Sequence, residues 1–128
     1  PNYQDIIPSK FKTSIILKKD EFLNQIKTAS LFSGRINEVK ILISSDKKEI
    51  EIFAKSPDIG ENKSKIPVKI EGGSVSTSFN YKFLIDGLLN IKSSEVIFDI
   101  SKEEGPCVLR PVGDSSYIYV VMPIKSIQ

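Results

Sequence analysis

The sequence predicts an α+β domain in which one unit, a strand followed by a helix and three further strands, occurs twice. Segments such as 38–43 and 49–54 alternate apolar and polar residues, as strands do when one face is buried. Two other segments, 20–32 and 81–91, place apolar residues at helical spacing. We therefore expect two helices packed on antiparallel sheets, because each element then buries its apolar face.

The first unit follows an extended lead-in over residues 1–12, where Pro1 and Pro8 restrict the backbone. Acidic residues at 20 and 21 suit the first turn of a helix, and Gly34 follows its end. Pro67 lacks a backbone N–H, which favours an edge position for the third strand after the helix. The predicted elements are a strand at 13–17, a helix at 20–32, strands at 38–43, 49–54 and 65–70, and a polar loop at 56–64.

The second unit begins after the turn at Gly72-Gly73. Asn80 is a favourable N-cap residue for the second helix. The predicted elements are a strand at 74–78, a helix at 81–91 and strands at 95–100, 106–112 and 117–124. Both units together form a single domain over residues 1–128.

Composition narrows the function classes. The 128 residues include no histidine, which removes the commonest general base and metal ligand. The single cysteine, Cys107, excludes a disulfide within the chain, and we expect no metal and no cofactor. Carboxylate or lysine chemistry remains open, but the lack of histidine disfavours an enzyme. We expect a cytoplasmic protein, since neither a signal peptide nor an apolar run of the ~20 residues that span a membrane is visible. The initial proline suggests a piece of a longer protein.

The last predicted strand is apolar on both faces. Tyr117, Tyr119 and Val121 alternate with Ile118, Val120 and Met122, and no charge separates Asp114 from Lys125. This pattern fits a strand covered on both sides, and it also fits a strand with one face kept for a partner.

Three further apolar residues fall outside the core stripes of the helices. Phe83 points away from the stripe of the second helix, while Leu31 and Phe32 leave the stripe of the first. A frayed helix end beneath a loop explains the latter pair, and so does a contact with another subunit. Basic residues flank both helices, and the sequence favours solubilising roles over contacts with phosphates. They are Lys18, Lys19, Lys27, Arg35, Lys82 and Lys92.

Two segments together resemble one protein family. FNYKFLIDGLL at 79–89 and YVVMPIK at 119–125 are similar to the third, C-terminal domain of the bacterial DNA polymerase III β subunit, the replication sliding clamp. The resemblance implies a DNA-clamp fold and a homodimeric ring of three such domains per subunit that encircles duplex DNA without catalysis. It also implies an apolar pocket that holds short motifs of DNA polymerases, the clamp loader and repair proteins.

The resemblance assigns residues to these roles. The pocket wall would comprise Pro1, Ile6, Phe83, Val120 and Met122, with Pro123 and Ile124 beside them and Pro106 and Cys107 nearby. Leu31 and Phe32 match an apolar pair at the contact between subunits, and Lys27, Arg35 and Lys82 are the candidates to face DNA. The chain has Asp5 where some members have arginine, and Phe83 where tyrosine is typical. By itself this domain is expected to be a monomer.

One alternative from another class is a small ligand-binding α+β domain or a carboxylate-dependent hydrolase. It requires Asp86 or the acidic residues of the 99–104 segment to converge in a cleft.

Overall fold

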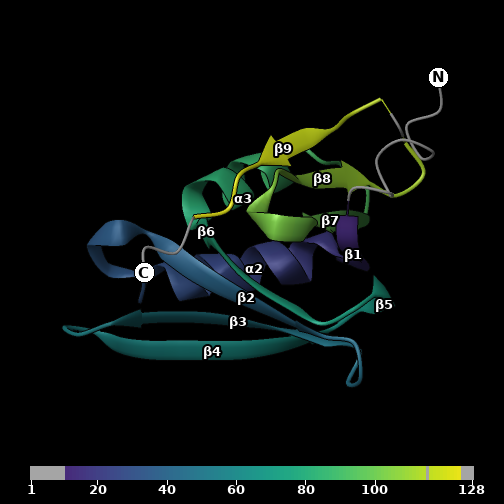
Figure 1. Cartoon of the computed structure of the whole chain (residues 1–128). Coiled ribbons are helices and arrows are strands. Elements are labelled where there is room, and N and C mark those ends of the chain that lie inside the picture. The colour runs from purple at the N-terminus through teal and green to yellow at the C-terminus, as the bar shows by residue number, and fades with distance from the viewer. Residues whose placement is uncertain (1–10, 115, 125–128) are drawn as a thin grey trace.

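The computed structural model describes residues 11–114 and 116–124 of the chain. Two helices and two antiparallel sheets make up an α+β fold, as the sequence predicts (Figure 1). The elements are β1 (Phe11–Lys18), α2 (Lys19–Ser30), the 3₁₀ turn η2 (Gly34–Ile36), β2 (Glu38–Ser44), β3 (Glu49–Ser56), β4 (Gly60–Pro67), β5 (Lys69–Gly72), β6 (Val75–Asn80), α3 (Tyr81–Leu89), β7 (Glu95–Ser101), η3 (Lys102–Glu104), β8 (Cys107–Pro111) and β9 (Tyr119–Val121).

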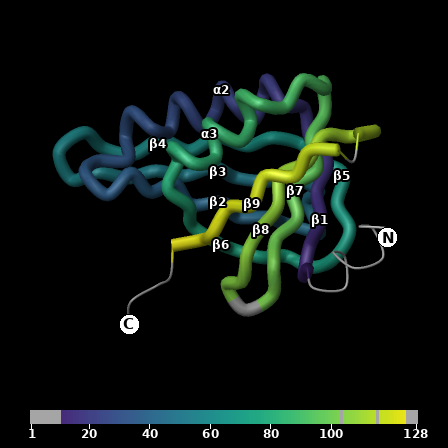
Figure 2. The backbone as a smooth tube through the Cα atoms, turned by 90° about the horizontal axis from the view of Figure 1, so that it is seen from above, coloured from purple at the N-terminus to yellow at the C-terminus, as the bar shows by residue number. Residues whose placement is uncertain are grey.

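The two sheets have the strand orders β5-β1-β7-β8-β9 and β4-β3-β2-β6. Helices α2 and α3 lie side by side along one side of the molecule (Figure 2). The Lys19 ammonium donates a hydrogen bond of 2.8 Å to the Ile91 carbonyl, which ties the start of α2 to the segment after α3.

An aromatic cluster fills the centre of the core. Phe22 of α2 and Phe79 of β6 both pack against Phe98 of β7, with ring centroids 5.9 and 5.5 Å apart. All three side chains are fully buried. Because Phe79 and Phe98 belong to different sheets, their contact joins the sheets to each other and to α2.

The duplication extends to how each unit ends. In the first unit β4 pairs with β3, and after Pro67 the chain crosses to the other sheet, where β5 pairs with β1. In the second unit β9 pairs with β8, and the chain then crosses to β6, where the Ile124 N–H donates to the Ser78 carbonyl at 2.8 Å. The last strand of each unit therefore contributes to both sheets.

Several predicted boundaries are wrong. The expected loop at 56–64 contains the first five of the eight residues of β4, which pairs with β3 along its whole length. Strand β4 lies at a sheet edge, as Pro67 predicts, and such a strand is held by backbone hydrogen bonds that need no apolar pattern.

Other elements are shorter or divided. The single strand expected at 65–70 is split between β4 and β5, the helices end at Ser30 and Leu89, and only 119–121 of the last strand is regular. Phe11 and Lys12, expected in the lead-in, open β1, and the rest of the lead-in lies outside the described residues.

Candidate docking surface

Four apolar side chains on α3 and on the segment from β9 to residue 124 remain exposed. Phe83, Val120 and Met122 expose 55%, 57% and 54% of their surface, and Ile124 exposes 38%. We call this group the α3–β9 surface. The alternation of β9 explains it, because Val121 points into the core while its neighbours Val120 and Met122 point outward.

The first unit shows what the fold requires at the same positions. Phe83 is the third residue of α3, and the third residue of α2 is Glu21. The two final strands can be aligned through their partners. Ile16, two residues before the N-cap of α2, pairs with Lys69. Ser78, two residues before the N-cap of α3, accepts a hydrogen bond from the Ile124 N–H, so Ile124 is equivalent to Lys69. Counting back from these two residues aligns Met122 with Pro67 and Val120 with Lys65.

The counterparts of the α3–β9 surface are thus Glu21, Lys65, Pro67 and Lys69, all of them exposed. The fold accepts charge or proline at each place where the second unit exposes a large apolar side chain. Packing within the domain therefore does not explain these apolar residues.

A second group of exposed apolar residues lies near the C-terminal end of α2. Leu31, Ile36 and Ile59 are each more than half exposed and surround a depression of about 560 Å³, which Arg35, Lys55 and Asp58 also line. Ile36 belongs to η2, and Ile59 lies between β3 and β4. We call this group the η2 surface.

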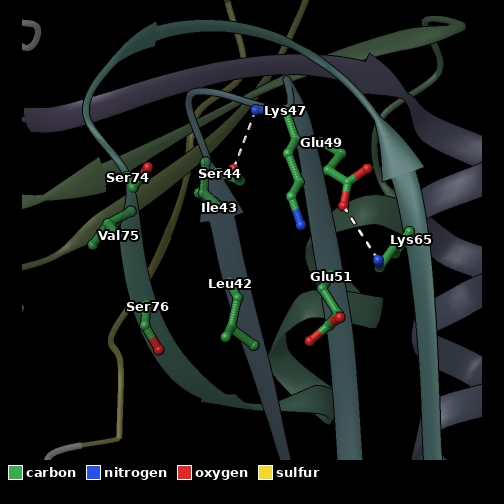
Figure 3. A pocket seen from close by; sticks show the side chains of 10 residues that line it. All are labelled: Leu42, Ile43, Ser44, Lys47, Glu49, Glu51, Lys65, Ser74, Val75 and Ser76. Carbon is green, nitrogen blue, oxygen red and sulfur yellow. Dashed lines mark hydrogen bonds and ion pairs between the residues drawn. The ribbon is translucent and has the colours of Figure 1, made fainter.

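A second depression, of about 530 Å³, lies over β2, β3, β4 and β6 (Figure 3). Serines and charged side chains line most of it, and the Lys65 ammonium lies 3.7 Å from the Glu49 carboxylate. Its two carboxylates are Glu49 and Glu51, and within the described residues they belong to no group of three or more acidic or cysteine side chains that could hold a metal ion.

Comparison with known proteins identifies the family. Residues 4–125 match the family described as "DNA polymerase III beta subunit, C-terminal domain". The chain belongs to this family.

The sliding clamps that this chain resembles are longer than the chain itself. A beta sliding clamp of Staphylococcus aureus is 29% identical over 127 residues, and one of Synechococcus elongatus is 24% identical over 126 residues. Each match covers 98% of this chain but only 34% of the relative. The chain thus spans about a third of the length of the clamps it resembles.

Solved structures show the same fold. The DNA polymerase III beta subunit of Thermotoga maritima matches with a TM-score of 0.87 and 30% identity, over 99% of this chain and 34% of that one. A Pseudomonas aeruginosa sliding clamp bound to griselimycin matches with a TM-score of 0.86 and 20% identity, over 98% of this chain and 34% of that one. Both support the α+β clamp fold.

The residues that the resemblance assigns to a peptide pocket differ in their exposure. Phe83, Val120, Met122 and Ile124 form the α3–β9 surface, and Pro106 is exposed, whereas Pro123 is buried. Pro1 and Ile6 lie outside the described residues.

Cys107 lies in the core, where it exposes only 1% of its surface. Burial raises the pKa of its thiol to about 11. Its neighbour Val108, which the sequence did not single out, pairs with Val120 and is itself buried, with 6% of its surface exposed. Successive residues of a strand point to opposite faces, so an inward Cys107 in β8 would have indicated that Val108 lies on the same face as Val120.

Leu31 and Phe32, which the resemblance assigns to the subunit contact, differ in exposure. Leu31 is exposed in the η2 surface, whereas Phe32 is half-buried and packs against the core. Sequence reasoning missed Ile36 and Ile59, because neither lies in a segment with a recognisable period.

The candidates to face DNA are all exposed. Lys27 lies in the last turn of α2, Lys82 at the start of α3, and Arg35 in η2 beside Leu31. Helix α2 also carries two acidic residues, Asp20 and Glu21, in its first turn.

Two acidic residues of the hydrolase alternative, Asp99 and Asp86, make contacts away from each other. Asp99 is buried, pairs with Arg110 at 2.8 Å and accepts a hydrogen bond from Ser14 at 2.6 Å. Asp86 accepts a hydrogen bond from the Tyr119 hydroxyl. Within the described ranges, no three acidic or cysteine side chains gather as a metal site would require, and no helix is long and apolar enough to cross a membrane.

Proposed function

We propose that this chain is the peptide-binding domain of a replication sliding clamp, a non-catalytic ring in the cytoplasm that encircles duplex DNA. Its α3–β9 surface holds short motifs of DNA polymerases, the clamp loader and repair proteins. The observation that supports this most strongly is the difference between the two units, in which exposed Phe83, Val120 and Met122 stand where the first unit has Glu21, Lys65 and Pro67.

Apolar burial is the source of affinity at such a surface. Each Å² of apolar area removed from water contributes about 25 cal/mol. Phe83, Val120 and Met122 are each about half exposed, so they present apolar area to water at a cost in free energy. Apolar side chains of a peptide can cover this area. Pro1 and Ile6 complete this wall in the proposal.

The test is a titration of a clamp-binding pentapeptide against the complete protein. Met122→Ala removes most of one wall side chain, so we expect the affinity to fall about tenfold. Leu89→Ala is the matched control, because Leu89 is an equally exposed apolar residue that belongs to neither the α3–β9 surface nor the η2 surface. Equal affinity of Met122→Ala and the unmodified protein would remove the support for this site.

The η2 surface is the proposed contact between subunits. Leu31 is its central residue, and Phe32 supports it from the core side. The contact needs a surface from another domain, so residues 1–128 alone are expected to sediment as a monomer. A dimer that persists on dilution would contradict this assignment.

The proposed contact with duplex DNA is electrostatic and independent of base sequence. Lys27, Arg35 and Lys82 are the candidates, and the chain's net charge is only +2. Such contacts release counterions, so binding should weaken steeply as salt increases and should not distinguish between DNA sequences.

A further inference from the structure

Gly87 lies in the interior of α3, where glycine disfavours a helix relative to alanine. The structure gives a packing reason for it. A Cβ atom added at Gly87 would lie 2.6 Å from Cδ1 of the Tyr119 ring and 3.0 Å from Cγ and Cε1. The tyrosine ring therefore occupies the place where a side chain at residue 87 would be.

Two tyrosines bind the last segment to this turn of α3. The Tyr119 hydroxyl donates to Oδ2 of Asp86 at 3.0 Å, and the Tyr117 hydroxyl donates to the Gly87 carbonyl at 3.4 Å. Strand β9 is three residues long and pairs with β8 along one edge. Helix α3 is thus the second support that determines where β9 lies.

We propose that Tyr119, Gly87 and Asp86 form a positioning unit that fixes the spacing between Phe83 on α3 and Val120 and Met122 beside it. This inference rests on the proposed function, since the spacing determines how well a peptide fits the α3–β9 surface. Phe83 lies one helical turn before Gly87, and Val120 follows Tyr119 directly on the opposite face of β9.

The first unit shows that this arrangement is not required by the fold. The seventh residue of α2 is Gln25, which corresponds to Gly87, and the strand residue that corresponds to Tyr119 is Ser64. In the first unit the large side chain is on the helix and the small one on the strand, and in the second unit the sizes are exchanged. The pair of Gly87 and Tyr119 therefore belongs to the unit that carries the exposed apolar residues.

The experiment compares pentapeptide affinities of variants of the complete protein. Gly87→Ala should lower the affinity about tenfold, because the added methyl group displaces the ring and with it β9. Tyr119→Phe keeps the ring and removes the hydrogen bond to Asp86, so we expect a loss of about threefold.

Rescue separates positioning from general destabilisation. Leucine has no ring to collide with a methyl group at residue 87, so Gly87→Ala combined with Tyr119→Leu should bind more tightly than Gly87→Ala alone. Two changes that merely destabilise the domain would instead add. The methyl resonance of Met122, identified by its absence from the Met122→Ala spectrum, should shift in the unliganded Gly87→Ala and Tyr119→Phe proteins.

The outcomes distinguish this inference from the proposed function. Loss of affinity in Met122→Ala together with unmodified affinity in Gly87→Ala and Tyr119→Phe would overturn the positioning unit alone. Unmodified affinity in Met122→Ala would overturn the proposed function and the inference with it. Should Gly87→Ala fail to fold, Tyr119→Phe decides, and an unmodified affinity with an unshifted Met122 resonance would refute the inference.

Discussion

Phe98 and Phe83 carry the same side chain in opposite environments. Phe98 is fully buried between Phe22 and Phe79, whereas Phe83 is more than half exposed. Phe98→Ala should reduce the free energy of unfolding by about 3–5 kcal/mol, because it removes apolar contacts and leaves a cavity. Phe83→Ala should change it by less than about 1 kcal/mol. Urea unfolding of both variants measures the difference, and equal losses would contradict the burial described here.

Cys107 offers a second test at single residues. Its thiol is buried and its pKa is raised from 9.0 to about 11, so little thiolate forms in the folded protein. We expect no reaction with a disulfide reagent near about pH 8 until denaturant is added. The stability that the buried neutral thiol provides is complete below pH 9.0 and is lost as the pH rises towards about 11. Cys107→Ala should lack that loss, and rapid labelling of the folded protein would show that the thiol is accessible.

The two helices begin differently, although they occupy equivalent places. Asn80 caps α3, and its Oδ1 accepts a hydrogen bond of 2.9 Å from the Lys82 N–H, whereas Lys18 makes no side-chain cap on α2. Asn80→Ala should therefore cost about 1 kcal/mol of unfolding free energy. Lys18→Asn, which introduces the cap of the second unit, should stabilise by up to about 1 kcal/mol. Denaturant midpoints that move in neither direction would contradict this view of the helix starts.

Element types were easier to predict from the sequence than element limits. Strands with one apolar face, such as β2 and β3, are evident from alternation because burial selects every second residue. The first five residues of β4 escaped prediction because Asn62 and Ser64 occupy its inward positions, and backbone pairing with β3 holds the strand in place. The crossing at Pro67 depends on tertiary contacts that no local pattern records.

The sequence predicted individual residues of the α3–β9 surface, but their arrangement depends on the whole molecule. Phe83 stood out because it left the helix stripe, and Val120 and Met122 because their strand was apolar on both faces. Their union in one surface depends on how β9 lies against α3, which Tyr119 and Gly87 determine over a separation of 32 residues. The exposure of Ile36 and Ile59 likewise follows only from the assembled sheets.

The most direct test of the account exchanges the surface of one unit for that of the other. Phe83→Glu, Val120→Lys and Ile124→Lys together place the first unit's residues at the equivalent positions. Since the first unit folds with these residues exposed, the triple variant of the complete protein should keep its unfolding free energy within about 1 kcal/mol. Its affinity for the clamp-binding pentapeptide should fall below detection. A triple variant that unfolds, or that binds the peptide as tightly as the unmodified protein, would contradict the central claim.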